Sequence, residues 1–591
     1  MSRRSIFAIL VAGLVASTAR AGEVPKHAPI HLSPALERQF ALTALSHLKG
    51  PAQRPFLNLL KSLPPARQVG VTISGNATKN MSCSGGICTP TAPIAVLNVS
   101  QLTRMLVDQG VTVATSAQAP DIFLNAPFSW TSANGLTLQA IGNIVVNKAV
   151  SDAGPAPLAL TYNANGAGGE LSFGDKGHIS FMSTGNALTI NGQSYILANS
   201  VQLLAQLIAR NPSGNFALSA NYNARQDGKY THAPIPTTLM GRLNGLGNML
   251  SGLKVESTDG GNNGGVIVAT GTGGKIDYLR VQNAHIAFNP YAAACVGGVV
   301  GVNNGTLSGV SFSGTVTAFS MGDYVEAGGI ACENEGTIAT ATASGSVNAT
   351  STVEFARAGG IAASSGGSVD LSSASNTVWA EGNGSDQGDC SIAAGGLYGF
   401  DIGATAASSF ATGDVTAKDI AINNACAGGL VGATGATIVN SSAAGSATAY
   451  AGSDAGWMAG GLVGLSFEGT IQNSSATGPA SADNAGGLVG GNLATVEGST
   501  ANGAVSGPNG AYVGGLIGYW QSYQGSTVTN SKSYGTVTNG GGGLVGGFVG
   551  ADATPGNFSN DGWCTTSSGI TDPSQGAGNI PNDPGITPFT C

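Results

Sequence analysis

The chain has 591 residues, 92 of them glycine, and only 9% of its residues are charged, whereas about 25% is usual for a globular domain. Residues 283–591 contain three Lys or Arg and 20 Asp or Glu, a net charge of −17, so residues 1–282 carry +9 of the total of −8. An acidic surface repels phosphate backbones, and no dense basic run is present. Nucleic acid is therefore excluded from the expected partners.

The first 21 residues predict a secretory signal peptide. Met1–Arg4 is positively charged, Ile6–Ala16 is apolar and Ala19–Ala21 has the small residues of a cleavage site. The apolar run is too short to cross a bilayer, although an uncleaved anchor is the alternative. No later segment reaches about 18 uninterrupted apolar residues, so we expect no transmembrane segment in the mature chain.

Residues 22–68 differ from everything that follows and are expected to be a helical or disordered leader. Ser33-Pro34 can begin a helix that Gly50 ends. A second helix can run from Pro55 to Leu63, because Pro64-Pro65 cannot continue it.

From residue 69 to residue 282 the pattern is mainly that of β-strands. Val99–Asp108 and Ser200–Arg210 carry helical apolar stripes and are expected as inserted helices. Short strands separated by Gly, Asn and Pro are expected at 121–124, 136–138, 143–146, 158–161, 179–181 and 188–190. Their spacing suits either stacked β-helix coils or a sandwich.

A repeated phrase organises residues 283–550: Gly-Gly, an aliphatic residue, usually Val or Ile, and another Gly. The pairs begin at Gly297, Gly328, Gly359, Gly395, Gly428, Gly460, Gly486, Gly514 and Gly542, in steps of 31, 31, 36, 33, 32, 26, 28 and 28 residues. Repeats of this length without long helical patterns indicate a solenoid. We therefore expect an all-β fold, a right-handed parallel β-helix of about nine coils.

One coil can be read between Ala459 and Ser481. Gly460–Gly464 is expected as a first strand and Gly469–Ser474 as a second, with a third after Gly478. The expected core is a stack of Leu462, Val463 and Ile471 on Leu430, Val431 and Ile438. Glycine suits corners that need a positive φ or a close approach of two backbones. Asn440, Asn473 and Asn530 recur at matching places and could form a ladder of side-chain hydrogen bonds.

Eight cysteines in an exported chain indicate disulfides, although eight allow 105 pairings. Cys295 and Cys332 are 37 residues apart and Cys390 and Cys426 are 36 apart, about one coil, and adjacent coils are separated by about the Cα distance of a disulfide. The sequence thus predicts the pairs Cys83–Cys88, Cys295–Cys332, Cys390–Cys426 and Cys564–Cys591. Zinc at Cys83-x4-Cys88 is the alternative, but no second Cys or His pair has partner spacing.

The recurring segments Ala427–Gly432, Ala459–Gly464, Ala485–Gly490 and Val513–Gly518 resemble the GLUG motif. Residues 121–150 and 188–192 are similar to regions of filamentous haemagglutinin-like bacterial exoproteins. The resemblance implies an exported protein, secreted or at the cell surface of a bacterium, with the periplasm as a further possibility. Residues 551–591 end the repeats, and they are expected to form a disulfide-tied cap over the last coil.

The sequence lacks the motifs of common catalytic centres. No H-E-x-x-H, G-x-S-x-G or phosphate-binding glycine loop occurs, and no cofactor or metal is expected. Asp386 and Asp389 could hold calcium, although a solvated loop is the alternative. We expect a non-enzymatic, monomeric adhesin or haemagglutinin-like protein that binds a host or cell-surface glycan or protein. The alternative is a β-helix enzyme that processes polysaccharides, which would need two carboxylates about 5–10 Å apart in a cleft.

Large aromatic side chains are the expected contacts of such a binding protein. Tyr519, Trp520 and Tyr523 lie in what reads as a corner insertion. Either these three are exposed and contact the ligand, or they belong to the core.

Overall fold

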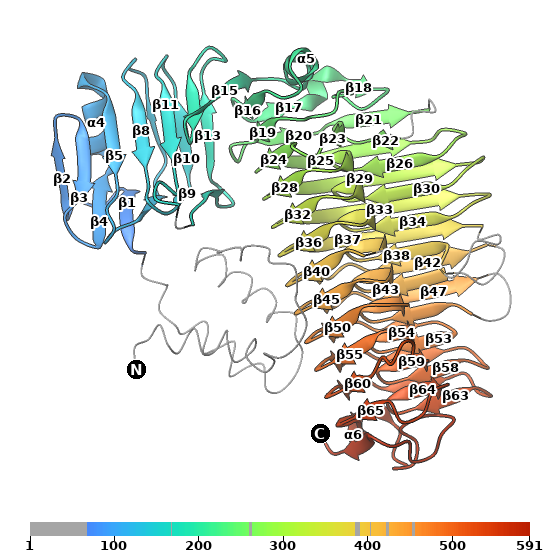
Figure 1. Cartoon of the computed structure of the whole chain (residues 1–591). Coiled ribbons are helices and arrows are strands. Elements are labelled where there is room, and N and C mark those ends of the chain that lie inside the picture. The colour runs from blue at the N-terminus through green and yellow to red at the C-terminus, as the bar shows by residue number, and fades with distance from the viewer. Residues whose placement is uncertain are drawn as a thin grey trace.

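The structure is a computed structural model that describes residues 68–591 except 167, 259–262, 384–389, 402, 421–424 and 452–455. The expected signal peptide, the leader up to residue 67 and the loop containing Asp386 and Asp389 lie outside the described residues. Parallel strands stacked in long sheets make up most of the fold, a parallel β-helix (Figure 1). No helix in the described ranges is both long enough and apolar enough to cross a membrane.

The first part of the fold is a short stack of three-stranded coils. Three consecutive coils are β6 (Asp121–Leu124), β7 (Phe128–Trp130) and β8 (Leu136–Gln139); β9 (Ile144–Val146), β10 (Ala149–Asp152) and β11 (Leu158–Thr161); β12 (Leu171–Phe173), β13 (His178–Phe181) and β14 (Leu188–Ile190). Equivalent strands pair in parallel, as in Ile122 with Ile144. The choice between coils and a sandwich is therefore settled in favour of coils.

The outer end of this stack consists of β1 (Gly70–Ser74), β2 (Met81–Ser84), β3 (Ile87–Pro90), β4 (Ile94–Asn98), α4 (Val99–Asp108) and β5 (Val111–Ala114). The helix begins where predicted because the Asn98 side chain accepts hydrogen bonds from the Ser100 and Gln101 amides. Leu102 and Leu106 are buried against the coils, and α4 closes that end of the core.

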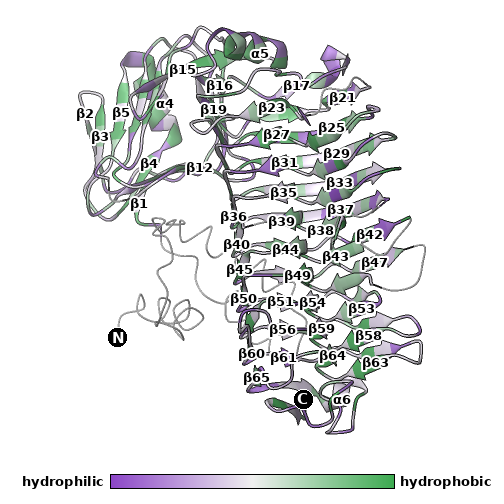
Figure 2. Cartoon of the chain, turned by 45° about the vertical axis from the view of Figure 1, so that its right-hand side comes forward, coloured by the Kyte–Doolittle hydropathy of each residue, from purple (hydrophilic) through white to green (hydrophobic). Residues whose placement is uncertain are grey.

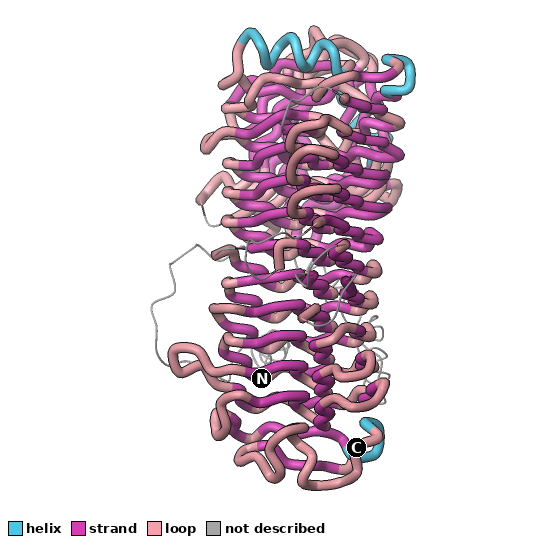
Figure 3. The backbone as a smooth tube through the Cα atoms, turned by 90° about the vertical axis from the view of Figure 1, so that its right-hand side faces the viewer, coloured by secondary structure: helices cyan, strands magenta, loops and turns pink. Residues whose placement is uncertain are grey.

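The chain reverses direction at Asn191-Gly192. Both residues have positive φ, 48° and 76°, as in the type I′ turn of a two-residue hairpin. The hairpin joins β14 to β15 (Gln193–Ala198) in antiparallel pairing, and β15 then pairs in parallel with β16 (Asn215–Leu218). Helix α5 (Val201–Arg210), predicted from the sequence, covers the first end of the second, longer stack (Figures 1 and 3).

The strands of the longer stack form four walls, and in the later coils wall I holds two short strands per coil. In one coil, wall I contains β47 (Ala447–Ala451), wall II β48 (Met458–Gly460), wall III β49 (Val463–Ser466) and wall IV β50 (Thr470–Gln472), and β51 (Ser475–Ala476) returns to wall I. Wall II runs from β22 (Asn263–Gly264) to β63 (Leu544–Gly546), and wall III from β23 (Ile267–Thr270) to β64 (Val549–Asp552), ten described strands each. Figure 3 shows these coils stacked one on another.

The arrangement of strands in the four walls corrects three details of the predicted β-helix. Gly460–Gly464 is not one strand but the corner between walls II and III, because a tight turn occupies Gly461-Leu462. The last glycine pair begins at Gly546, which pairs with Gly514, and not at Gly542. The boundary expected at residue 282 falls inside β25 (Arg280–Phe288), so the same stack continues through it.

The apolar core follows the predicted stacking. Val431 pairs with Val463 and Ile438 with Ile471 in successive coils, and all four side chains are fully buried, as are Leu430 and Leu462. Hydrophobic and hydrophilic residues are interspersed along the strands of each coil (Figure 2), because alternate side chains point into the core and outward.

One corner of several successive coils is held by polar side chains. Between walls IV and I the amides of Ser409, Ser441 and Ser474 each donate to the serine hydroxyl of the next coil, over 3.2 Å. The neighbouring Asn440 and Asn473 have positive φ and form the bend. The predicted asparagine ladder is thus made mainly by serines, although Asn560 Nδ2 does donate to Asn530 Oδ1 over 2.7 Å.

The C-terminal residues pack on the last coil. β66 (Asp561–Cys564) continues wall I, the one-turn helix α6 is Thr565–Ser568, and β67 (Ile586–Phe589) pairs in parallel with β66. Trp563 is fully buried beneath this segment. The strand edges of wall I are therefore covered at the end of the stack.

Candidate functional site

An aromatic and charged patch lies on the outer face of wall I, halfway along the stack. It consists of Trp379 and Glu381 on β37 (Ser373–Gly382), Lys418 on β42 (Val415–Asp419) and Tyr450 on β47, and we call it the wall I patch. Val378 and Ala380 on β37 are fully buried. Because side chains alternate along a strand, Trp379 and Glu381 point outward.

The parallel register brings these residues together from three successive coils. Glu381 pairs with Lys418 and Lys418 with Tyr450, on strands that lie side by side in Figure 1. Lys418 Nζ is 2.6 Å from Glu381 Oε1, and Trp379 Nε1 donates to Glu381 Oε2 over 3.2 Å. The hydrogen bond to Glu381 raises the pKa of Lys418. Glu381 is therefore held between an ammonium group and an indole.

The rings of Trp379 and Tyr450 are 6.4 Å apart, centroid to centroid, and are steeply inclined at 71°. The residues paired with Trp379 in the next two coils are Thr416 and Thr448. The wall I patch thus offers aromatic faces, a carboxylate, an ammonium group and hydroxyls on one face of a sheet. The aromatic side chains can stack on the apolar face of a ligand ring, and the polar groups can form hydrogen bonds with the hydroxyls around that ring.

The other two cations of residues 283–591 have aromatic partners. The Arg357 guanidinium lies 4.6 Å from the centroid of Phe355 and 4.0 Å from that of Phe400, and it pairs with Glu326 over 3.2 Å. Lys532 Nζ lies 5.6 Å from the centroid of Phe589. Such contacts stabilise a cation in place, so these groups hold neighbouring coils together.

Arg357 belongs to a row of side chains on the outside of the corner between walls II and III. Further along the row, Cys390, Cys426, Ala433 and Leu465 form a small buried cluster outside the main core. Near its end Tyr512 stacks on Tyr519, with ring centroids 6.4 Å apart. This row packs the two walls against each other.

The three aromatics proposed from the sequence fall in different environments. Tyr519 is half-buried on β59 (Ile517–Trp520), Trp520 is fully buried in the core, and Tyr523 is 45% exposed in the following loop. Trp520 occupies the inward corner position of wall III, paired with Asn492 and Asp552. The prediction that Trp520 contacts a ligand is therefore wrong, and the alternative prediction, that Trp520 belongs to the core, is confirmed.

The sequence reasoning missed the wall I patch. Trp379 and Glu381 are two residues apart in Thr377-Val-Trp-Ala-Glu381, which places them on one face of a strand. Glu381 lies 22 residues after Gly359, whereas Lys418 lies 23 residues after Gly395, so aligning the copies on their glycine pairs places Lys418 one residue out of register. The pairing of Glu381 with Lys418 therefore follows from the structure and not from the repeat spacing or any local motif.

All four disulfides join the cysteines that spacing had paired: Cys83–Cys88, Cys295–Cys332, Cys390–Cys426 and Cys564–Cys591. The Cys295–Cys332 and Cys390–Cys426 bonds link adjacent coils, with Cα atoms 5.5 and 5.2 Å apart. Cys83–Cys88 closes the β2–β3 hairpin. The cysteines therefore serve as cross-links along the stack.

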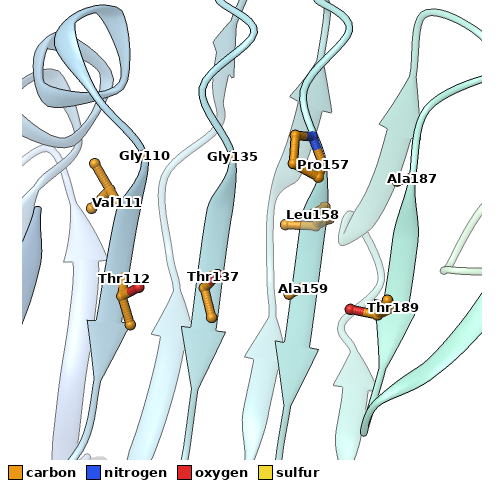
Figure 4. Close-up of a pocket in the computed structure, with 10 residues that line it drawn as sticks. All are labelled: Gly110, Val111, Thr112, Gly135, Thr137, Pro157, Leu158, Ala159, Ala187 and Thr189. Atoms are coloured by element: carbon orange, nitrogen blue, oxygen red, sulfur yellow. The ribbon is translucent and has the colours of Figure 1, made fainter.

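A concavity of about 330 Å³ lies on the outer face of the N-terminal coils (Figure 4). Thr112, Thr137 and Thr189 on β5, β8 and β14 extend along it, and Pro157 lies at its edge. The residues around it are Gly, Val, Thr, Pro, Leu and Ala. This lining offers hydroxyls and apolar contacts but no ionisable side chain for acid–base chemistry.

One family model matches the chain: the GLUG motif, over residues 455–482. This segment contains β48, β49, β50 and β51, which span walls II to IV and the return to wall I. The match supports a GLUG-repeat protein. No curated protein is significantly similar to the chain in sequence.

Proposed function

We propose that this chain is an exported, non-enzymatic β-helix protein that acts as an adhesin or haemagglutinin-like binding rod, and that it binds a cell-surface glycan at the wall I patch. The GLUG match suggests an extracellular repeat protein, and four disulfides are compatible with an oxidising compartment. A binding role is supported above all by the wall I patch, where Trp379 and Tyr450 flank the Glu381–Lys418 ion pair.

The chemistry of the wall I patch favours a carbohydrate over a protein partner. Sugar rings have apolar faces that pack on aromatic side chains, and their hydroxyls bond carboxylates and ammonium groups. The patch lies on the outer face of a sheet, which suits one segment of a longer glycan chain. Repeated threonines at the coil spacing, such as Thr416 and Thr448, extend the polar surface along the rod.

A glycan array probed with the purified protein tests the proposal. We expect binding that Trp379→Ala and Tyr450→Ala each weaken at least tenfold, while Tyr523→Ala, an exposed aromatic outside the patch, leaves it unchanged. Circular dichroism would show that each variant keeps its fold. Binding that is lost with Tyr523→Ala and kept with Trp379→Ala would reject this site.

A polysaccharide-cleavage screen with the same protein tests the enzymatic alternative. Turnover of any polymer would overturn the non-enzymatic part of the proposal. Absence of glycan binding, together with binding to a protein receptor, would retain a binding rod but reject its carbohydrate ligand.

A further inference from the structure

Two buried carboxyl groups meet where the C-terminal segment closes the stack. Asp552 is the last residue of β64, at the inward corner position of wall III, and Asp583 comes from the loop before β67. Each is only 3% exposed. The two carboxyl groups lie within hydrogen-bonding reach of each other.

Threonine, asparagine and aspartate side chains at the same corner of earlier coils have partners. Thr270 Oγ1 donates to Asn303 Oδ1 over 2.6 Å, Asn303 Nδ2 donates to Asn334 Oδ1 over 2.7 Å, and Thr434 Oγ1 donates to Asp401 Oδ2 over 2.8 Å. Asp552 Oδ1 likewise accepts the Thr554 amide over 2.7 Å. Asp552 Oδ2 and both carboxylate oxygens of Asp583, in contrast, accept no hydrogen bond from any described residue.

These three are the only buried carboxylate oxygens without a donor in the described part of the chain. Asp561, also fully buried in the same cap, shows the usual arrangement: the Ser531 and Ser559 amides donate to its two oxygens over 2.7 and 3.0 Å. No Lys or Arg of the described residues forms an ion pair with Asp552 or Asp583. Two adjacent buried carboxylates without a counter-charge repel each other and lose their hydration.

We propose that Asp552 and Asp583 bind a divalent cation, with Ca²⁺ preferred, which fastens the C-terminal cap to the last coil. The available donors are carboxylate oxygens, and Ca²⁺ takes six to eight oxygen ligands in a flexible geometry, including backbone carbonyls and water. Neither a thiolate nor an imidazole is part of the pair, which disfavours Zn²⁺ and Cu²⁺. The cation supplies the charge that the pair otherwise lacks.

The cation would reinforce contacts that already join the cap to β64. The Asn579 side chain bonds the backbone of Asp552 twice, accepting from its amide over 2.8 Å and donating to its carbonyl over 2.7 Å. The Ile586 amide donates to the Asp583 carbonyl at the start of β67. The pair thus links the end of wall III to the strand that covers wall I.

Calorimetric titration of the EDTA-treated full chain with CaCl₂ tests this site directly. We expect one bound Ca²⁺ per chain and a melting temperature several degrees higher in Ca²⁺ than in EDTA. Asp552→Asn and Asp583→Asn should each weaken binding at least tenfold and remove the rise. Asp572→Asn, at an exposed aspartate of the same cap, should change neither.

Tb³⁺ luminescence of the unmodified protein keeps the test decisive if an Asn variant fails to fold, because Ca²⁺ should displace Tb³⁺ from a single site. Binding that Asp552→Asn and Asp583→Asn both leave intact would place the cation elsewhere and overturn the assignment. A protein that binds no Ca²⁺, and whose two Asn variants melt at or above the temperature of the wild type, would show instead that the carboxyl groups share a proton.

Discussion

A Cβ atom on Gly460 would lie 1.9 Å from the carbonyl oxygen of Val463. The same relationship recurs along walls II and III, as between Gly428 and Val431 at 1.8 Å and between Gly486 and Val489 at 1.9 Å. These glycines do not have positive φ values. The repeated glycine pair is therefore required by the close approach of two backbones at one corner, and not by an unusual backbone conformation.

Gly460→Ala should consequently be strongly destabilising, because the atom it meets belongs to the backbone and cannot rotate away. We expect a loss of about 3 kcal/mol or more of unfolding free energy, at or beyond the upper end of overpacking in a core. Gly75→Ala is the matched control, since a Cβ there meets no atom within 4 Å. Urea unfolding of both variants measures the difference. Similar stabilities would show that the corner can open without cost.

The length of the repeat, the core residues and the cysteine pairs could be predicted because equivalent residues recur in successive coils. Val431 and Val463 occupy equivalent places in two copies, so their stacking follows from counting residues. The corner at Gly461-Leu462 could not be predicted in the same way, since an apolar run flanked by glycines suits a strand equally well. The last glycine pair was misplaced because Gly540–Gly543 supplies additional pairs of identical residues.

Ser441→Ala should remove one rung of the serine ladder. The Ser441 hydroxyl accepts the buried amide of Ser409 over 3.2 Å, and an unsatisfied buried donor costs about 1–3 kcal/mol. Ser442→Ala changes a half-buried neighbour on the outer side of the same coil and should be nearly neutral. Thermal melting of the two variants, compared with the wild type, distinguishes a structural ladder from incidental proximity. Equal melting temperatures would mean that the Ser409 amide finds another acceptor.

The candidate site could be predicted less well than the fold. Binding residues lie on the outer face, where packing places few constraints on the sequence. Trp520 and Trp379 are both single tryptophans in β-rich segments, yet only the coil register shows that Trp520 points inward and Trp379 outward. A site assembled from Glu381, Lys418 and Tyr450 spans three coils, and no short motif can reveal it.

Replacing Cys390 and Cys426 together by alanine should destabilise the stack more than replacing Cys83 and Cys88. The first pair closes a 36-residue separation and the second a 5-residue separation. A longer loop loses more entropy on cross-linking, so the chain-entropy model gives about 4 kcal/mol for the first pair and about 2 kcal/mol for the second. Unfolding in urea, with each double variant compared with the wild type, gives both values. The opposite order would mean that local strain or packing outweighs loop entropy.

Asp561→Asn should change how stability depends on pH. Burial is the main cause that raises the pKa of Asp561 from 3.8 to about 6, although the Ser531 and Ser559 amides lower it. Because the folded state holds this proton more tightly than the unfolded state, the wild type loses stability as pH rises from about 4 to about 6 and does not regain it above that. The loss from this one group is on the order of 1–3 kcal/mol.

The asparagine carries no charge and still offers one oxygen to the Ser531 amide, so it should lack this component of the pH dependence. Thermal melting at pH 4 and pH 7 measures the effect. We expect Asp561→Asn to gain stability relative to the wild type on going from pH 4 to pH 7, while Asp572→Asn, at an exposed aspartate with a lowered pKa, shows no such gain. Parallel pH profiles for Asp561→Asn and the wild type would show that folding does not raise the pKa of Asp561.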